Sequence, residues 1–273
     1  MIIDCHAHLW KTQIGKVNGR DVFSAGNGKN CSLDFASAFD MGLVRQAFHN
    51  ALELSDDEKL KEEIKEKTPL LYPFKEGENG ICEWHKDFET PEKGHRHFSP
   101  LYSFYPGDII GFYENAEQTE WIKRLFHYRI DNWSQYIGWS AAWAICLAAR
   151  LRESETVQKV IRGMLTLSVF KNLFCVHPPF YFQIDGNMGF VAGINEMLIT
   201  EENGAVELIP ALPKSFGSSG EVKNMVVNGA KISFKWKNGL VTDIHSNKPV
   251  SIVNKHLSKT ITTDINISVL AES

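Results

Sequence analysis

The chain has 273 residues, of which 43% are hydrophobic, and a formal net charge of -4 at pH 7. This composition predicts one or two globular domains and, with no basic stripe, argues against a nucleic-acid-binding protein. Five scattered cysteines without a CxxC pair favour reduced thiols over a disulfide framework or a zinc site. No apolar run is long enough to span a membrane, and the first residues lack the pattern of an export signal.

The first ten residues, MIIDCHAHLW, carry Asp4, His6 and His8 in a DxHxH pattern. Alternate residues of a strand face one side, so the two histidines could bind one metal ion. The pattern resembles the opening strand of the metal-dependent amidohydrolases, but the alternating strands and helices of their barrel do not follow. Residues 11–30 are rich in Gly, Asn and Lys, which predicts a linker. We therefore expect residues 1–30 to be linker-like or unrelated to the rest.

Helical spacing begins near Asp34 and recurs through the middle of the chain. The segment 138–151 is apolar almost all round, which is typical of a helix buried by other helices. The middle of the chain is therefore predicted to be an all-α body of antiparallel helix pairs. The expected helical segments are residues 34–52, 56–67, 121–126, 138–151 and 157–165.

A stretch without helical or strand spacing, residues 68–115, follows the second expected helix, and loops of this length are usually functional. It contains Glu83 beside Trp84, and then Arg96 and His97 close to two tyrosines. Flat aromatic faces that stack on a sugar ring, with charged groups that bind its hydroxyls, are what a sugar-binding cleft needs. A solvated loop position for Glu83, and a surface cluster or weak metal site for the HRH sequence, stay open as alternatives.

A second candidate segment, HPPFYFQIDGNMGFVAGINEML, runs from His177 to Leu198 and places Asp185 among aromatic and apolar neighbours. An unpaired carboxylate in such surroundings is costly, so Asp185 is expected to be either a hydrogen-bonded core residue or a site residue. Asn187 is expected to cap a helix that continues through Val191.

After Glu201 helical spacing gives way to alternation. Residues 231–237, KISFKWK, predict a strand with one apolar face and one lysine-rich face. The Asn238-Gly239 pair that follows predicts a type I′ hairpin turn. Residues 204–273 are therefore expected to form a small antiparallel β-sandwich domain without a catalytic group.

Four motifs, in this order, resemble the glycoside hydrolase family 95 α-L-fucosidases: CEWHKDFETPEKGHRHFSPLYSFYPG, GWSAAW, NLFCVHPPFYFQIDGNMGFVAGINEML, and ELIPALP with the VKNM and KWKNG region. The resemblance covers about residue 31 to the C-terminus. It implies part of an (α/α)6 toroid over residues 31–203, followed by the β domain of residues 204–273. It also implies removal of terminal α-linked fucose, typically α-1,2, with inversion and without a metal or other cofactor. Full-length relatives are often exported, so the localisation stays open.

The same resemblance implies site residues at the matching positions. The Glu of the EW motif is Glu83, the expected general acid. The Asp of QIDGN is Asp185, which in the family polarises an upstream Asn that orients the attacking water. We expect the two carboxyl groups to face one cleft, about 6.5–9.5 Å apart as in inverting enzymes. The expected substrate-binding residues are Trp84, Arg96, His97, His177 and Asn187.

Three features depart from the family pattern. Cys82 stands where a Gln is usual, Pro100 stands where a His is usual, and the upstream NxN segment has no counterpart in the sequence. The chain is therefore expected to be truncated or rearranged and to be a very poor fucosidase alone. Unclosed helices are expected to expose residues such as Trp139 and Trp143, which favours self-association.

The expected partner is a fucosylated glycan, and neither nucleic acid nor a membrane is expected. Two alternatives stay open beside the glycosidase. One is a non-catalytic glycan-binding remnant. The other is a metal-dependent amidohydrolase-like N-terminus fused to a glycosidase fragment.

Overall fold

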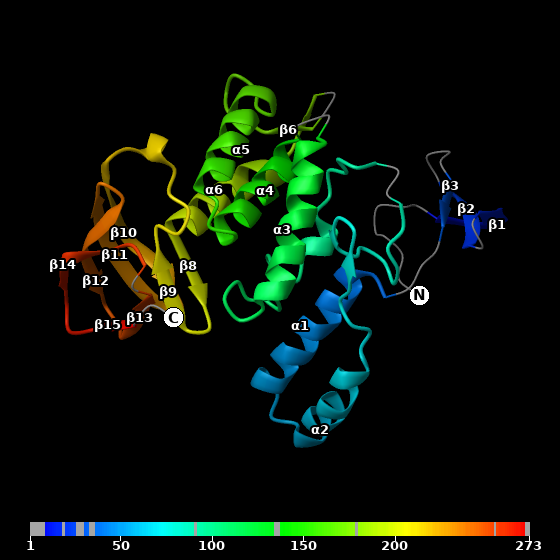
Figure 1. The fold of residues 1–273 in the computed structure, drawn as a ribbon, viewed down its shortest axis with the longest axis horizontal. Helices are drawn as coiled ribbons and strands as arrows, with labels where there is room; N and C mark the ends of the chain where they lie inside the picture. Colours follow the sequence, from blue (N-terminus) through cyan, green and yellow to red (C-terminus); the bar gives the residue numbers. More distant parts are fainter. Residues whose placement is uncertain are drawn as a thin grey trace. The chain divides into compact units, whose positions relative to one another are not determined.

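The computed structural model describes most of the chain, in the ranges 9–17, 20–25, 30–32, 36–89, 92–133, 137–177, 180–253 and 255–270. Helices dominate from α1 to α6 and strands dominate after α6, which confirms a helical domain followed by a β module (Figure 1). The chain divides into two compact units. They are Met1–Lys93 with Ser99–Asp131, and Gly94–Phe98 with Asn132–Ser273.

The first unit begins with a three-stranded antiparallel sheet, where composition predicted a linker. Val17 pairs with Arg20, and the two residues between them in the sequence are Asn and Gly, the pair that hairpin loops favour. The strands also contain Trp, Ile, Val and Phe, which have high β propensity. The linker prediction considered only the many Gly, Asn and Lys residues. The DxHxH pattern of Asp4, His6 and His8 lies outside the described residues. The strands are β1 (Leu9–Val17), β2 (Arg20–Ala25) and β3 (Asn30–Ser32).

Three helices follow in the first unit, and side-chain caps set where the first two begin. Ser37 Oγ accepts the Asp40 N–H at 3.2 Å, so the first helix starts at Ala38, later than spacing from Asp34 suggested. Asp57 Oδ1 caps the second helix in the same way, through the Leu60 N–H at 3.1 Å. The helices are α1 (Ala38–Leu54), α2 (Glu58–Lys67) and α3 (Ala116–Asp131).

The stretch between α2 and α3 has only short regular pieces, as its lack of periodicity predicted. Arg45 of α1 fixes its beginning by donating from Nη2 to the carbonyl of Tyr72 at 3.0 Å. The pieces are η1 (Thr68–Leu70), β4 (Glu76–Gly77), β5 (Gly80–Ile81) and η2 (Ser99–Leu101).

The helices of the second unit are α4 (Gly138–Arg150), α5 (Ser154–Leu167) and α6 (Ile184–Leu198). α4 packs against both α5 and α6, and nearly all of its residues are buried, as its apolar sequence predicted (Figure 1). A short connection joins α4 to α5, as in an antiparallel helix pair. None of the helices in the described ranges combines the length and apolarity needed to cross a bilayer.

α4 and α6 run in the same direction, which corrects the expectation of antiparallel pairs alone. Gly186, Gly189 and Gly193 of α6 lie successively against the start, middle and later turns of α4. A Cβ added at Gly193 would lie 2.6 Å from Cγ2 of Ile145, closer than side-chain carbons approach. Glycines at these positions therefore let the two helix backbones come together.

We predict that Gly193→Ala destabilises the chain by about 1–3 kcal/mol, because the new methyl group overpacks against Ile145. In an unconstrained helix the same change stabilises by about 1 kcal/mol, so the sign of the change in unfolding free energy is diagnostic. Urea denaturation of the full chain measures it. Ile145→Ala removes the side chain that the new methyl group meets, so the double variant Gly193→Ala/Ile145→Ala should lose less stability than the two single losses added together. Stabilisation by Gly193→Ala alone would show that the helices have room to spare.

The β module consists of two four-stranded sheets whose apolar faces supply one core, with Val206 and Ile252 from the first and Phe234 and Ile244 from the second. The first sheet has the order β15-β13-β9-β8 and the second β10-β11-β12-β14. The strands are β8 (Ile199–Glu202), β9 (Ala205–Leu208), β10 (Ser219–Val227), β11 (Ala230–Lys237), β12 (Leu240–Ser246), β13 (Val250–Val253), β14 (Leu257–Thr263) and β15 (Ile267–Leu270).

The expected purely antiparallel arrangement is wrong. β14 pairs parallel to β12, and β13 pairs parallel to both β9 and β15. From β12 to β15 the chain alternates between the two sheets. After each strand in the other sheet, the chain returns to the first sheet and runs parallel to the strand that it left there.

Three hairpins of the module turn at Asn-Gly pairs. Asn238 and Gly239 have φ of 54° and 77°, the left-handed conformation that a type I′ turn needs at both positions, so this predicted turn is confirmed. Asn203-Gly204 and Asn228-Gly229 connect their strands with the same signs of φ. The alternating faces of β11 are confirmed as well, since Ile232, Phe234 and Trp236 are buried.

We predict that Gly239→Ala lowers the free energy of unfolding by about 1–2 kcal/mol, because alanine is disfavoured at positive φ. No atom lies within 4 Å of the added Cβ, so the loss is conformational and not steric. Gly239→Asn is the matched control, and it should cost less because asparagine tolerates this conformation. Thermal unfolding of both variants compares them; equal losses would count against the turn assignment.

Candidate active site

Glu83 follows β5, and a glycine brings that strand onto α3. Gly80 has a φ of +115°, and a Cβ at this position would lie 2.1 Å from the carbonyl oxygen of Trp121 and 2.6 Å from the backbone nitrogen of Leu125. Only a residue without a side chain allows this approach. The β4–β5 hairpin therefore rests on the backbone of α3 and carries Glu83 toward that helix.

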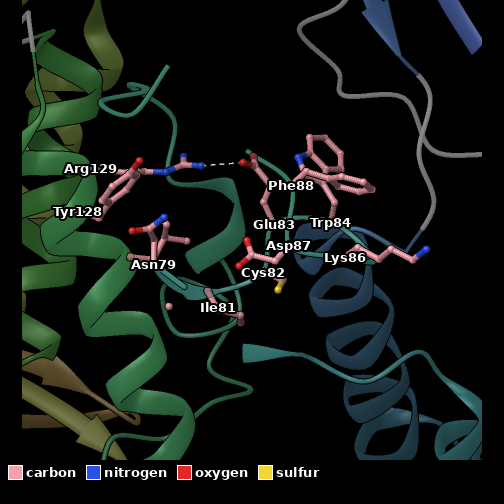
Figure 2. A pocket seen from close by; sticks show the side chains of 12 residues that line it. Asn79, Ile81, Cys82, Glu83, Trp84, Lys86, Asp87, Phe88, Tyr128 and Arg129 are labelled. Atoms are coloured by element: carbon pink, nitrogen blue, oxygen red, sulfur yellow. Dashed lines mark hydrogen bonds and ion pairs between the residues drawn. The ribbon is translucent and has the colours of Figure 1, made fainter. Parts of the chain in front are cut away.

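Two bonds then fix Glu83. Its carbonyl accepts the N–H of Ala38 at 2.9 Å, one of the first-turn donors of α1 that have no partner within their own helix. Its carboxylate oxygen Oε2 accepts from Nη2 of Arg129 at 2.8 Å (Figure 2). The side chain of Arg129 is 2% exposed and that of Glu83 is 25% exposed. Sequence reasoning missed Arg129, although a buried arginine on an apolar helix face requires an acidic partner.

Glu83 and Trp84 line a pocket of about 30 Å³ (Figure 2). This is room for water, well below the roughly 300–1,000 Å³ of ligand sites. The pocket is therefore too small by itself to hold a sugar ring. The remaining lining residues are Asn79, Gly80, Ile81, Cys82, Lys86, Asp87, Phe88, Leu125, Tyr128 and Arg129.

Cys82, one of the departures from the family pattern, is buried in this pocket. Burial raises the pKa of its thiol, and the charge of Asp87 raises it further, while Lys75 opposes the shift. A thiol with a raised pKa is a poor nucleophile. Cys82 therefore packs beside Glu83 as a small apolar group. Pro100, the other substituted position, is buried within η2.

His97 and Arg96 belong to the second unit. His97 is 6% exposed, and its ring lies 4.9 Å from the rings of both Trp139 and His95. Trp139 in turn lies 5.5 Å from Trp143 along α4. The two tryptophans are half-buried, so the expectation that they form an exposed face is wrong. These aromatic contacts hold His97 against the first turn of α4.

Asp185 lies in the first turn of α6, and its side chain is exposed. The alternative of a hydrogen-bonded core residue is therefore wrong, because the apolar neighbour Ile184 is itself 53% exposed. An acidic group is favourable at this end of a helix. Next to it, Gln183 Oε1 accepts the Trp139 N–H at 3.0 Å and so links the starts of α6 and α4. Asp185 and His97 consequently lie by neighbouring helix ends.

Asn187 does not cap α6, because that helix already begins at Ile184. Its Oδ1 accepts the Cys175 N–H at 2.8 Å and its Nδ2 donates to the Leu173 carbonyl at 2.9 Å. Asn187 therefore fixes the loop before the hairpin formed by β6 (Val176–His177) and β7 (Tyr181–Phe182). His177 pairs with Tyr181 in this hairpin.

The predicted site residues thus fall into two groups. Glu83 and Trp84 share a pocket in the first unit, whereas the second unit holds Arg96, His97, His177, Asp185 and Asn187. The distance between the carboxyl groups of Glu83 and Asp185 stays a prediction. In the part of the chain that the structure describes, no three His, Cys, Asp or Glu side chains converge in a way that could hold a metal ion.

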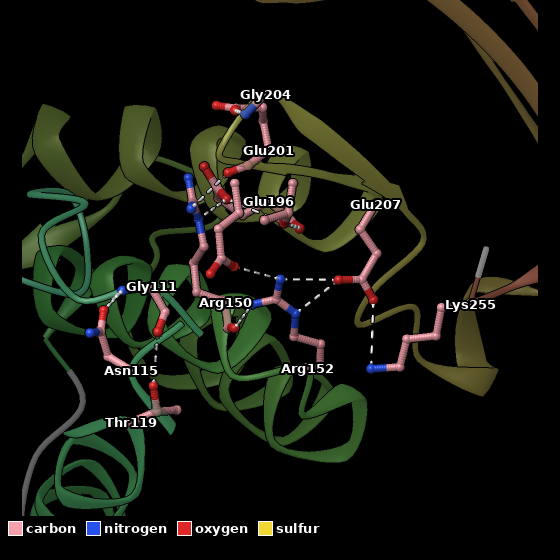
Figure 3. A network of polar contacts seen from close by, with 12 residues as sticks. Gly111, Asn115, Thr119, Arg150, Arg152, Glu196, Glu201, Gly204, Glu207 and Lys255 are labelled. Atoms are coloured by element: carbon pink, nitrogen blue, oxygen red, sulfur yellow. Dashed lines mark hydrogen bonds and ion pairs between the residues drawn. The ribbon is translucent and has the colours of Figure 1, made fainter. Parts of the chain in front are cut away.

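The other ends of α4 and α6 carry a network of ion pairs (Figure 3). Arg150 Nε donates to Glu196 Oε2 at 2.6 Å, and Arg152 lies 3.0 Å from Glu207 Oε2 of β9. Lys255 lies 3.8 Å from the second oxygen of Glu207. The side chains of both Arg152 and Glu207 are buried, and their contact attaches the β module to the helices.

Comparison with known proteins gives consistent results. The chain is 30% identical over 236 residues to "Alpha-L-fucosidase 2" of Arabidopsis thaliana, which covers 80% of this chain and 27% of that protein. It is 28% identical over 207 residues to "Probable alpha-fucosidase A" of Aspergillus niger, covering 69% and 26%. The protein of the same name from Aspergillus oryzae is 26% identical over 249 residues, covering 78% and 34%. The chain thus spans about a quarter to a third of the length of these relatives.

The family model of the Glycosyl hydrolase family 95 catalytic domain matches residues 16–198. The matched range begins inside the amino-terminal sheet, upstream of residue 31, and ends with the last residue of α6. The β module lies beyond it. Because this match covers most of the chain, the chain belongs to glycosyl hydrolase family 95.

Proposed function

We propose that this chain supplies the acid-bearing part of an active site that removes terminal α-linked fucose from glycans. The observation that carries the proposal is the fixation of Glu83, the Glu of the EW motif, by a backbone hydrogen bond and a buried arginine. Family membership and the printed names of the relatives support the fucoside as substrate class. Arg96 and His97 would bind the sugar, together with Trp84, His177 and Asn187.

The proposed reaction inverts the anomeric carbon. Glu83 gives its proton to the glycosidic oxygen as the bond to the anomeric carbon breaks, and the bonding electrons leave with that oxygen. Water adds from the opposite face and loses a proton to a base. Asp185 would polarise the amide that orients this water, and that amide has no counterpart within the 273 residues. The parallel pair α4 and α6, with α5 between them in sequence, supports the arrangement of a partial (α/α)6 toroid.

We predict that the chain alone hydrolyses an α-1,2-fucosylated oligosaccharide very poorly, and that adding the amino-terminal half of a relative's catalytic domain increases turnover. In that mixture Glu83→Gln should lower turnover by about 10²–10⁴-fold, the usual contribution of a positioned general acid. Released fucose is the readout.

The matched control is Glu78→Gln, because Glu78 is an exposed acid of the same hairpin. Its activity should equal that of the unchanged chain. If Glu83→Gln and Glu78→Gln behave alike, Glu83 is not the acid.

Glycan binding without turnover is the second candidate, and the β6–β7 hairpin favours it. Phe180, Tyr181 and Phe182 are 81%, 70% and 51% exposed, and exposed aromatic rings form stacking surfaces for sugars. Calorimetric titration with the same oligosaccharide separates the two functions. The binding function would be favoured if the chain binds the oligosaccharide, if Tyr181→Ala abolishes this binding, and if neither the chain nor the mixture shows turnover.

The apolar face of α6 supports self-association. Ile184, Met188 and Val191 recur at helical spacing and are 53%, 64% and 57% exposed, on a helix whose glycines face α4. Such a stripe is unusual on a solvated surface. We propose that a second copy of the chain covers this face.

We predict that Met188→Lys with Val191→Lys shifts the chain toward the monomer, because two charges would have to be desolvated in the contact. Sedimentation velocity measures the distribution. Leu54→Lys is the control, since Leu54 is a highly exposed leucine at the end of α1, away from this stripe in sequence. A monomeric unchanged chain would contradict the proposal.

A further inference from the structure

We infer that Arg129 is the positioning residue for the acid Glu83: it fixes the orientation of the carboxyl group and compensates the negative charge that remains after proton transfer. The inference rests on the proposed function, in which Glu83 is the proton donor. It goes further by giving a role to a residue on α3, 46 positions away in sequence.

The geometry of the ion pair supports this role. Its side chain is 2% exposed, and a buried guanidinium is costly unless a carboxylate compensates it. The guanidinium is planar with donors in fixed directions, so a bond of 2.8 Å to Oε2 also sets the plane of the Glu83 carboxyl group. Because Glu83 is 25% exposed, the pair is open to substrate on the side of the acid and closed on the side of the arginine.

The charge of Arg129 matters at the moment of reaction. As the proton donor of the proposed reaction, Glu83 becomes a carboxylate when the bond to the anomeric carbon breaks. A cation already held at hydrogen-bond distance stabilises that developing charge without having to move. Oε2 accepts from Arg129, which assigns the transferred proton to Oε1.

Other groups around Glu83 belong to the same electrostatic setting. The titratable side chains that line its pocket are Cys82, Lys86, Asp87 and Tyr128. At the start of α1, which bonds the Glu83 carbonyl, Asp40 accepts from Ser37 Oγ at 2.6 Å. A second arginine of α3, Arg124, pairs with Glu76 of the hairpin on the exposed surface. Arg124 is therefore a matched control, because it joins the same two elements away from the pocket.

The first test needs no catalysis. In the full chain labelled with ¹³C at glutamate carboxyls, the Glu83 resonance is assigned by its loss in Glu83→Gln. A hydrogen bond from a cation polarises the carboxyl group that accepts it, so Arg129→Met should shift this resonance, whereas Arg124→Met should leave it in place. An unshifted Glu83 resonance in folded Arg129→Met overturns the inference.

Arg129→Lys keeps the charge but loses the planar pair of donors, and it also serves if Arg129→Met does not fold. Its Glu83 carboxyl resonance should stay closer to that of the unchanged chain than to that of Arg129→Gln, the second neutral variant. Equal resonances for Arg129→Lys and Arg129→Gln would overturn the electrostatic part of the inference.

The second test uses turnover in the mixture with the complementary half-domain. Arg129→Lys should lower kcat by up to about 10²-fold with little change in KM, since a misplaced acid still allows substrate binding. Arg129→Met should lower kcat further than Arg129→Lys does, because it also loses the charge. Equal kcat values for the two variants, or a loss that falls on KM alone, indicate a merely structural role and overturn the inference. If no version turns over substrate, the proposed function fails, while the carboxyl resonance still decides the role of Arg129.

Discussion

Close contact between backbones, made possible by glycine, is the constraint on which this structure depends. At Gly193 the later turns of α6 press against Ile145 of α4, and at Gly80 the β4–β5 hairpin presses against α3. The first contact holds α6, which carries Asp185, against α4. The second sets where Glu83 lies. Both carboxylates of the proposed mechanism are therefore placed by contacts that tolerate no side chain.

Local patterns in the sequence predicted local structure well. The apolar α4, the alternating faces of β11 and the turn at Asn238-Gly239 each follow from a few adjacent residues, and the structure confirms them. The four motifs likewise identified the family, because each places a characteristic group of residues within a short stretch.

Long-range relations could not be predicted in the same way. Nothing near Glu83 in sequence points to Arg129, since only folding brings α3 to the hairpin. Neighbours in sequence suggested a buried Asp185, but apolar neighbours such as Ile184 and Met188 are exposed together with it. The parallel strand pairs depend on how the chain crosses between two sheets. Alternation of apolar and polar residues along one strand does not predict that crossing.

Arg152 forms ion pairs across the boundary between the helices and the β module. A chain that ended at residue 203 would keep Glu202, 3.4 Å from Arg152, and lose Glu207, the nearer carboxylate at 3.0 Å. The guanidinium would then keep only the more distant of these two acidic partners. The end of the family match at residue 198 is thus a boundary of sequence similarity, whereas the electrostatic unit extends into β9. A fragment that ends where the family match ends would separate Arg152 from Glu207, its nearer acidic partner.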